Sequence, residues 1–258
     1  MNTVKNLFEV LATEIRTCEK HGEYESQLIK IASRESWSPC SKCMDEAREA
    51  ENIERQKKDQ EDMLRRSIER RLGSACIPPR FQSKGFDSYV ANTKDQQKAL
   101  AKCKRYADQF KDNFENGRSL LLLGSVGTGK THLANAIANQ IITELGYTAL
   151  YATVGSMLRF IRSSFNNNDL SESEAYKTFI DPHLLIIDEI GVQKASEFEL
   201  TALFDIINER YEQMYPTVIV SNHGPKELAN YLGDRVVDRL REGGSVILFE
   251  WESARVKV

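Results

Sequence analysis

The stretch that decides the fold of this chain is Gly124-Ser125-Val126-Gly127-Thr128-Gly129-Lys130-Thr131. Its glycines let backbone N–H groups converge on phosphates, Lys130 neutralises the β and γ oxygens, and the Thr131 hydroxyl ligates Mg²⁺. The apolar run Leu120 to Leu123 before the loop is typical of a strand, and the helix that continues through His132 points its N-terminus at the anion. The order strand, loop, helix predicts that residues Gly124 to His132 bind the phosphates of ATP or ADP.

A second part of the site is predicted downstream. Leu184 to Ile187 is typical of a buried strand, and it ends in Asp188 and Glu189 at the carboxyl edge of the sheet. Asp188 is predicted to hold Mg²⁺ and Glu189 to polarise the attacking water. The alternative is a solvated acidic turn. A glutamate directly after the aspartate favours hydrolysis by water and argues against a nucleotide or metabolite kinase.

The next strand, Thr217 to Val220, leads to Asn222 at the same sheet edge. We expect the Asn222 amide to hydrogen-bond the γ-phosphate or the attacking water. As an alternative, Asn222 forms a turn before Gly224 and Pro225. Lys130, Asp188, Glu189 and Asn222 are therefore the first candidate catalytic residues.

Composition restricts the possible partners. The chain has 258 residues, 35 of them basic and 38 acidic, so its net charge of -3 requires any DNA contact to be local. No run has the length of a membrane span, and the N-terminus does not resemble a signal peptide, which predicts a cytoplasmic protein without a membrane partner. Five cysteines, two of them in a CxxC, favour a metal site over a disulfide scaffold.

A zinc site is predicted near the N-terminus. Cys18 and His21 form a CxxH pair, and Cys40 and Cys43 form a CxxC pair, so that two knuckles offer four ligands to one tetrahedral Zn²⁺. A segment this short buries little apolar surface, and the metal would supply most of its folding free energy. The alternative is a set of reduced thiols and a surface histidine.

Two helices are predicted around this module. Val4, Leu7, Leu11 and Ile15 recur at helical spacing and predict a short amphipathic helix. Met44 to Leu72 carries nine acidic and eight basic residues, which predicts an exposed helix that ends at Gly73 and serves as a linker or a partner-binding arm. The expected divisions are residues 1–43 (helix and zinc module), 44–76 (charged helix) and 77–258 (ATPase domain).

The third division alternates helices and strands. A helix at 95–114, the strand and phosphate loop, a strand at 149–153, an insertion, the Asp188 strand, a helix at 197–211 and the Asn222 strand are expected in that order. This alternation predicts an α/β domain of three layers around a parallel sheet, with the nucleotide at the carboxyl edge of the strands.

The insertion at 156–180 is a candidate DNA-binding element. Its first helix has an apolar side, and Phe165 could belong to that side. Arg159, Phe160 and Arg162 lie on the rest of the helix surface. The arginines suit contacts to neighbouring phosphates, and Phe160 suits base stacking. The alternative is a helix that packs on the sheet and solvates its basic side. A second helix begins with the capping box Ser171 to Glu174.

From about Ile77 to the C-terminus, the chain resembles the DnaC-type replicative helicase loaders, which are AAA+ P-loop ATPases related to the DnaA initiator. The resemblance lies in both nucleotide motifs and in the segments Ile187 to Gln193, Leu232 to Leu240 and Trp251 to Arg255. It implies that Arg239 is an arginine finger, that Arg255 is the sensor II residue, and that the insertion lines a DNA-facing surface. Without the family, Arg235 and Arg239 could form an intrahelical charge ladder.

A CxxH and CxxC module is not part of the enterobacterial DnaC pattern. The N-terminal module looks more like that of phage-encoded loaders and of the zinc-bearing primosomal loaders of Gram-positive bacteria. The resemblance implies an ATP-dependent loader that binds a DnaB-type replicative helicase hexamer, assembles as a homo-oligomer on it and holds single-stranded DNA. Two alternatives remain: an IstB-like transposition helper ATPase, and an adaptor that nucleotide switches without significant turnover.

Overall fold

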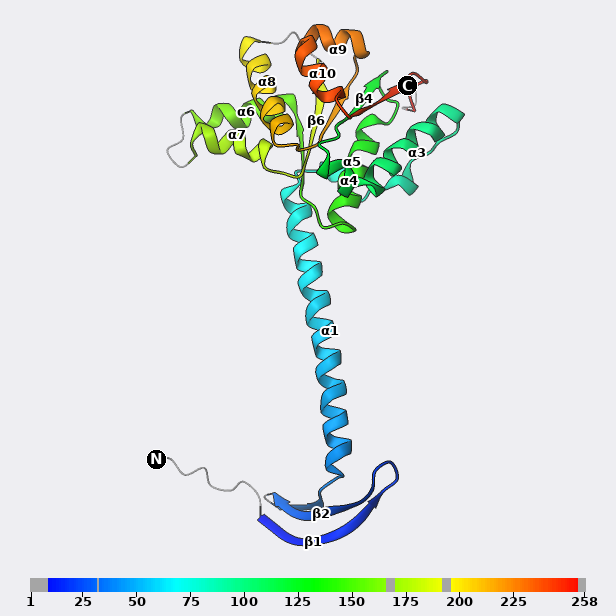
Figure 1. Cartoon of the computed structure of the whole chain (residues 1–258), viewed down its shortest axis with the longest axis vertical. Helices are drawn as coiled ribbons and strands as arrows, with labels where there is room; N and C mark the ends of the chain where they lie inside the picture. Colours follow the sequence, from blue (N-terminus) through cyan, green and yellow to red (C-terminus); the bar gives the residue numbers. More distant parts are fainter. Residues whose placement is uncertain (1–8, 32, 166–169, 192–195, 255–258) are drawn as a thin grey trace. The chain divides into compact units, whose positions relative to one another are not determined.

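The structure is a computed structural model, and it describes residues 9–31, 33–165, 170–191 and 196–254. The chain divides into two compact units, Met1–Arg66 and Ser67–Val258. The boundary between them falls within helix α1 (Ser41–Ser74) (Figure 1). Among the helices of the described ranges, none has the length and apolar character that crossing a bilayer requires.

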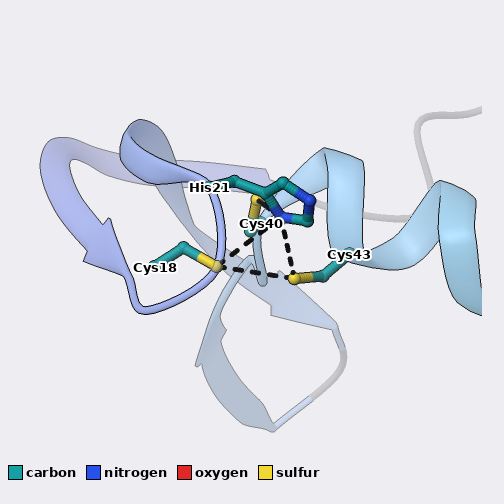
Figure 2. Close-up of side chains that lie close together, drawn as sticks. All are labelled: Cys18, His21, Cys40 and Cys43. Carbon is teal, nitrogen blue, oxygen red and sulfur yellow. Dashed lines mark hydrogen bonds between the residues drawn. The ribbon is translucent and has the colours of Figure 1, made fainter.

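The first unit contains a small antiparallel sheet. Its strands, in the order β1-β2-β3, are β1 (Glu9–Cys18), β2 (Gly22–Ile31) and β3 (Arg34–Trp37). Cys18 pairs with Gly22 at the closed end of the first hairpin, and Gly22 has a φ of 76°, a left-handed conformation that glycine adopts without strain. This turn brings Cys18 and His21 beside Cys40 and Cys43, at the start of α1 (Figure 2).

The prediction of an amphipathic helix at the N-terminus is wrong for the part of it that the structure describes, from Glu9 onward. Strand β1 occupies this position, and Leu11 and Ile15 are 42% and 73% exposed. Val4 and Leu7 lie outside the described residues. The segment is rich in β-branched valine, isoleucine and threonine, which favour extended backbone. Hydrogen bonding with β2 favours the strand over the helix, because the antiparallel ladder pairs the backbone of the segment on both sides of the register shift between Val10 and Ala12.

Helix α1 contains the predicted charged helix and extends it at both ends. None of its residues is buried, as expected for a segment dominated by charged side chains. Gly73 was expected to end the helix but lies within it. The chain leaves helical conformation at Cys76, where φ is 52°, and the Ala75 carbonyl accepts the backbone N–H of Tyr151 at 2.8 Å. The helix therefore ends where its chain meets a sheet strand.

A five-stranded sheet forms the centre of the second unit. Its order is β5-β6-β7-β4-β8 and its pairings are all parallel. The strands are β5 (Ala149–Thr153), β6 (Leu184–Ile190), β7 (Thr217–Ser221), β4 (Leu120–Gly124) and β8 (Ser245–Phe249). The central strands are almost continuous runs of leucine, isoleucine and valine, because helices cover both of their faces.

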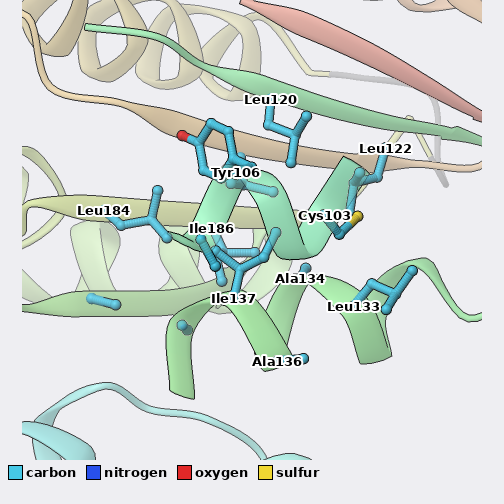
Figure 3. Packing of buried hydrophobic residues seen from close by; sticks show 14 of the residues in the cluster. Cys103, Tyr106, Leu120, Leu122, Leu133, Ala134, Ala136, Ile137, Leu184 and Ile186 are labelled. Atoms are coloured by element: carbon cyan, nitrogen blue, oxygen red, sulfur yellow. The ribbon is translucent and has the colours of Figure 1, made fainter. Parts of the chain in front are cut away.

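Two groups of helices enclose this sheet (Figure 1). On one face lie α3 (Lys94–Asp108) and α5 (Lys130–Thr143); on the other lie α6 (Val154–Ser164), α7 (Glu172–Ile180), α8 (Glu197–Glu212) and α10 (Asp234–Arg241). Leu120 and Leu122 belong to the core with α3 and α5 (Figure 3), whereas Leu121 and Leu123 belong to the opposite core. This arrangement confirms the predicted three-layer α/β domain.

The remaining elements differ in detail from the sequence prediction. They are α2 (Pro79–Gln82), the 3-10 turn η1 (Phe86–Ser88), α4 (Phe110–Glu115) and α9 (Pro225–Leu232). The helix predicted at 95–114 is divided between α3 and α4 at Gln109, and the Asn113 amide donates to the Tyr106 carbonyl across the break at 2.9 Å. Strand β8 was not predicted, although its sequence is apolar.

Candidate functional site

The phosphate-binding loop joins β4 to α5 and depends on close backbone approach. A Cβ at Gly124 would lie 2.4 Å from the Phe249 carbonyl oxygen, and one at Gly129 would lie 2.5 Å from Cε2 of Tyr89. Both glycines have positive φ, 127° and 95°. Only glycine satisfies both demands without strain, so the loop leaves its N–H groups free to surround an anion at the N-terminus of α5.

Lys130 is the first residue of α5 and is only 5% exposed. Its Nζ donates to the carbonyl oxygens of Gly124 and Ser125, each at 2.7 Å. The ammonium is therefore fixed within the loop, where a phosphate would meet both it and the backbone N–H groups.

Asp188 receives three hydrogen bonds. Its Oδ2 accepts from the Thr131 hydroxyl at 2.8 Å and from the Tyr151 hydroxyl at 2.9 Å, while Oδ1 accepts from the Glu189 backbone N–H at 2.7 Å. Burial raises the pKa of Tyr151, with the Asp188 carboxylate adding to the effect, so this phenol remains a donor. The two residues predicted to ligate Mg²⁺ thus lie in contact, and their oxygen atoms suit that ion.

Glu189 lies in a β-bulge. Ile187 pairs with Ile219 and Ile190 pairs with Ser221, so two residues of β6 oppose one of β7. Glu189 is exposed and has a φ of 63°, which is strained for any residue with a side chain. The bulge turns the carboxylate out of the sheet at the edge where the phosphate loop lies.

These groups line one cleft of about 550 Å³. The predicted residues that line it are Val126, Gly127, Thr128, Gly129, Lys130, Thr131, His132, Asp188, Glu189 and Asn222. Lining residues that the sequence did not indicate are Arg80, Phe81, Tyr151, Val220 and Ala254. The predicted residues therefore form the part of the cleft between the loop and the end of β6, because that part is built from consecutive motif residues. The rest comes from distant segments that no local pattern connects.

The C-terminal segment is one of these distant parts. The Trp251 indole N–H donates to the Thr128 carbonyl at 3.1 Å, and the Ala254 backbone N–H donates to the Gly127 carbonyl at 2.9 Å. Tyr89 also donates to the Thr128 carbonyl, at 3.0 Å. These contacts hold the loop from outside. Arg255, the candidate sensor II residue, lies outside the described residues.

Arg239 is not among the described residues that line this cleft. It lies on α10, with its guanidinium 5.3 Å from the ring centroid of Tyr211 and 5.9 Å from that of Phe204, both on α8. Its Nη1 is buried and has no hydrogen-bond partner among the residues that the structure describes. Arg239 therefore takes no part in lining its own chain's cleft.

The candidate DNA residues lie on α6. The buried side chains of this helix include Met157, Leu158 and Ile161, while Arg159 and Arg162 are exposed. Phe160 is 37% exposed and packs edge-on against Phe179, with ring centroids 5.7 Å apart. The helix thus buries one side and presents both arginines to solvent.

Two aromatic contacts near the end of α6 were not predicted. The Arg162 guanidinium lies 5.0 Å from the ring centroid of Phe198, which also contacts Phe165 at 5.9 Å. Phe165, which was expected on the apolar side of the helix, is 50% exposed. The capping box of the second helix is present, because the Ser171 and Glu174 side chains bond each other's backbone N–H groups.

The second candidate site is the cluster of Cys18, His21, Cys40 and Cys43, whose ligand atoms all lie within 4.8 Å of one another (Figure 2). The Sγ atoms of Cys18 and Cys43 are 3.4 Å apart, and His21 Nδ1 lies 3.2 Å from Cys43 Sγ and 3.7 Å from Cys40 Sγ. Zinc bonds of about 2.0 to 2.3 Å in a tetrahedron place ligand atoms about 3.3 to 3.8 Å apart. The spacing of this cluster is therefore compatible with zinc.

The groups around the cluster also fit a metal. His21 Nε2 lies 3.0 Å from Glu46 Oε1, so the ring donates outward and leaves Nδ1 facing the thiols. The backbone N–H of Lys20, followed by the Cys43 thiol, lowers the pKa of Cys18 to about 6, whereas the hydrogen bond with Cys18 raises the pKa of Cys43 to about 11, so Cys18 is the thiol of this pair that favours the thiolate. Ser26 and Cys40 are the buried side chains among the described residues of the first unit.

Comparison with known proteins gives concordant matches. Residues 26–258 match the family described as IstB-like ATP binding protein. The replicative helicase loader DnaC of Escherichia coli (strain K12) is 33% identical over 192 residues, which cover 74% of this chain and 77% of that protein. The replicative helicase loader DnaC of Buchnera aphidicola subsp. Acyrthosiphon pisum is 35% identical over 190 residues, which cover 73% of this chain and 76% of that protein.

Solved structures agree on the fold. The crystal structure of the DnaC helicase loader superposes with a TM-score of 0.60 at 24% identity, over 67% of this chain and all of that one. The crystal structure of DnaI gives a TM-score of 0.56 at 22% identity, over 70% and 95% of the two chains. The second unit therefore has the AAA+ P-loop fold.

Proposed function

Because this chain belongs to the IstB-like ATP-binding protein family, we propose that it is an ATP-hydrolysing loader, which binds a replicative helicase and delivers it onto single-stranded DNA at the start of replication. The observation that carries this proposal is its similarity to two replicative helicase loaders over 74% and 73% of the chain. The cleft supports the ATPase part, since it gathers the groups that phosphoryl transfer to water uses.

The chain's own residues have distinct parts in the proposed hydrolysis. Lys130 contacts the β- and γ-phosphate oxygens, and Glu189 orients the attacking water and takes its proton. Asn222 donates to the γ-phosphate or to that water. Thr131 and Asp188 would hold Mg²⁺, which when bound supplies positive charge to the transferring phosphoryl group.

We assign helicase capture to residues 1–43, with their zinc site, and to the charged helix within 44–76. Residues 77–258 carry the nucleotide chemistry. The exposed, charged surface of α1 supports a partner-binding role, since no part of that helix is buried.

The binding test uses the purified chain and a DnaB-type helicase hexamer. We expect co-purification with ATP, followed by transfer of the helicase onto circular single-stranded DNA, measured as strand unwinding. Capture of a transposase without any helicase would favour a transposition helper ATPase, the second candidate, which the family description supports. Helicase capture without ATP turnover would instead favour an adaptor that nucleotide switches without significant turnover.

Arg239→Ala is expected to keep ATP affinity within about twofold and to lower hydrolysis by about 100-fold or more, because an arginine finger stabilises the transition state and acts on a neighbour's nucleotide. Arg239 is not among the described residues that line its own chain's cleft and packs against Tyr211 instead, which is compatible with a contact in trans. Steady-state turnover and nucleotide titration measure the two effects.

Mixing gives the sharper measurement. Arg239→Ala and Glu189→Gln subunits together should recover turnover, because one kind of mixed interface has both Arg239 and Glu189 intact. Arg235→Ala, one helical turn away and exposed, is the matched control and should keep full activity. Absence of recovery in proven mixed assemblies would refute the trans role.

The double variant Arg159→Ala with Arg162→Ala is expected to weaken ATP-dependent binding to single-stranded DNA and to flatten its salt dependence. Loss of two phosphate contacts reduces the slope of log K against log salt by about 1.4. Fluorescence anisotropy with a labelled oligonucleotide at several salt concentrations measures both quantities, and Phe160→Ala tests stacking.

The matched control is Lys102→Ala with Arg105→Ala on α3, which removes two exposed cations at the same spacing. It should keep the parent's slope. If the α6 variant keeps the slope as well, the DNA contact lies elsewhere and α6 serves only to pack on the sheet.

A further inference from the structure

The turn that carries Glu189 is held by the segment that follows β7. The Ser221 hydroxyl donates to the Ile190 carbonyl at 2.8 Å, and the His223 backbone N–H donates to the Ser221 hydroxyl oxygen at 3.1 Å. The His223 ring reaches the next carbonyl, with Nε2 2.7 Å from the Gly191 oxygen. A carbonyl oxygen only accepts hydrogen bonds, so His223 carries a proton on Nε2.

Gly191 allows this close approach. A Cβ at this position would lie 2.2 Å from Cδ2 and 2.4 Å from Nε2 of His223. The φ of Gly191 is 83°, in the region that side chains disfavour. Any larger residue would displace the ring from the carbonyl that it bonds.

The ring is fixed on its other sides by α9. His223 Nδ1 lies 3.4 Å from Glu227 Oε2, and the same oxygen accepts the Gly224 backbone N–H at 2.9 Å. The Tyr231 ring lies nearly parallel, with centroids 6.4 Å apart and an interplanar angle of 29°. His223 therefore connects the start of α9 to the end of β6.

His223 bonds the same turn of backbone that sets the direction of the Glu189 side chain. Left-handed conformation strains a residue with a side chain and persists only where surrounding contacts enforce it. The hydrogen bonds from Ser221 and His223 to the carbonyls of Ile190 and Gly191 are contacts of this kind, and they lie immediately after Glu189 in the chain. Asn222 lies between the two residues that make them, so the same contacts fix its backbone relative to that of Glu189.

We propose that His223 is a positioning residue for the hydrolysis of ATP. Its hydrogen bond to the Gly191 carbonyl keeps Glu189 and Asn222 in the relative placement that the attacking water requires. The inference rests on the ATPase function proposed for this cleft. His223 is not among the described residues that line the cleft, so its loss should change kcat rather than affinity for ATP.

The first test compares His223→Ala with His223→Gln. The alanine variant should lower kcat for ATP by about 10- to 100-fold, as expected when a catalytic group is displaced by a fraction of an ångström to 1 Å. KM and the Kd for ATP should remain within about twofold. Glutamine retains an N–H donor near the Nε2 position and should restore kcat to within about threefold of the parent.

The second test is a double-mutant cycle with Gly191→Ala. This substitution should lower kcat in the parent, because its Cβ displaces the ring. It should lower kcat much less in the His223→Ala background, where the displaced group is missing. Additive effects of the two substitutions would mean that the contact between ring and carbonyl does not position the turn.

His183→Ala is the matched control. His183 is a half-buried histidine that accepts the Thr148 backbone N–H at 3.0 Å and is not among the described cleft-lining residues, so this variant should keep its kcat. An active parent with an unchanged kcat in His223→Ala, or a His223→Gln variant as slow as alanine, would overturn the inference. A parent without ATP turnover would instead refute the proposed function.

Discussion

Glu189→Gln is expected to bind ATP normally and to hydrolyse it about 100-fold or more slowly, because the amide cannot accept the proton of the attacking water. Lys130→Ala is expected to lose ATP binding itself. Lys130 is 5% exposed and its ammonium is held by two loop carbonyls, so the substitution removes a cation that the loop fixes where the phosphates are expected to lie. Equilibrium binding of a fluorescent ATP analogue and phosphate release separate the two effects.

Matched variants control for the change in charge. Glu197→Gln alters an exposed glutamate at the start of α8, and Lys226→Ala removes an exposed lysine of α9. Both should behave as the parent protein. Equal hydrolysis by Glu189→Gln and the parent would remove the role assigned to Glu189, and ATP binding by Lys130→Ala would do the same for Lys130.

Purified protein is expected to contain about one Zn²⁺ per chain, and Cys40→Ser or Cys43→Ser should release it. The described part of the first unit buries very little side-chain surface, so a bound metal would be its main source of stability, worth about 10 to 16 kcal/mol in comparable sites. Loss of zinc should therefore unfold residues 1–43 and expose them to proteases, while ATP binding by the second unit persists. Elemental analysis and limited proteolysis measure these outcomes.

Cys76→Ser is the control for this experiment. Cys76 is exposed and lies outside the cluster, so this variant should retain its zinc. Protein purified without chelators that contains no stoichiometric zinc would contradict the assignment. The four residues would then be reduced thiols and a histidine that lie close together without a metal.

Residues within one motif were predictable because their chemistry follows from adjacent positions. The phosphate loop, Asp188 and Glu189 line the same cleft, as the strand and loop patterns indicated. Tyr151 was not predictable as a donor to Asp188. The contact arises because β5 pairs with β6, and strand pairing is a property of the whole sheet.

The wrong prediction at the N-terminus and the missed strand β8 also arise because strand pairing is not visible in the local sequence. The spacing of Leu11 and Ile15 fits a helix, but pairing with β2 makes the segment a strand. Strand β8 was missed because its five residues carry no motif. Its Phe249 carbonyl nevertheless accepts the Ser125 N–H at 2.9 Å and helps to shape the phosphate loop.

The sequence by itself determined the α/β class, the phosphate-binding loop, the two carboxylates and the four candidate zinc ligands. Each of these depends on residue types at fixed short spacing, which set backbone freedom and ligand chemistry locally. Only the tertiary structure decided the strained conformation of Glu189, the contact of His223 with Gly191 and the position of Arg239 outside the lining of its own chain's cleft. These features depend on which strands and helices pack together, and packing brings together residues that lie far apart in the chain.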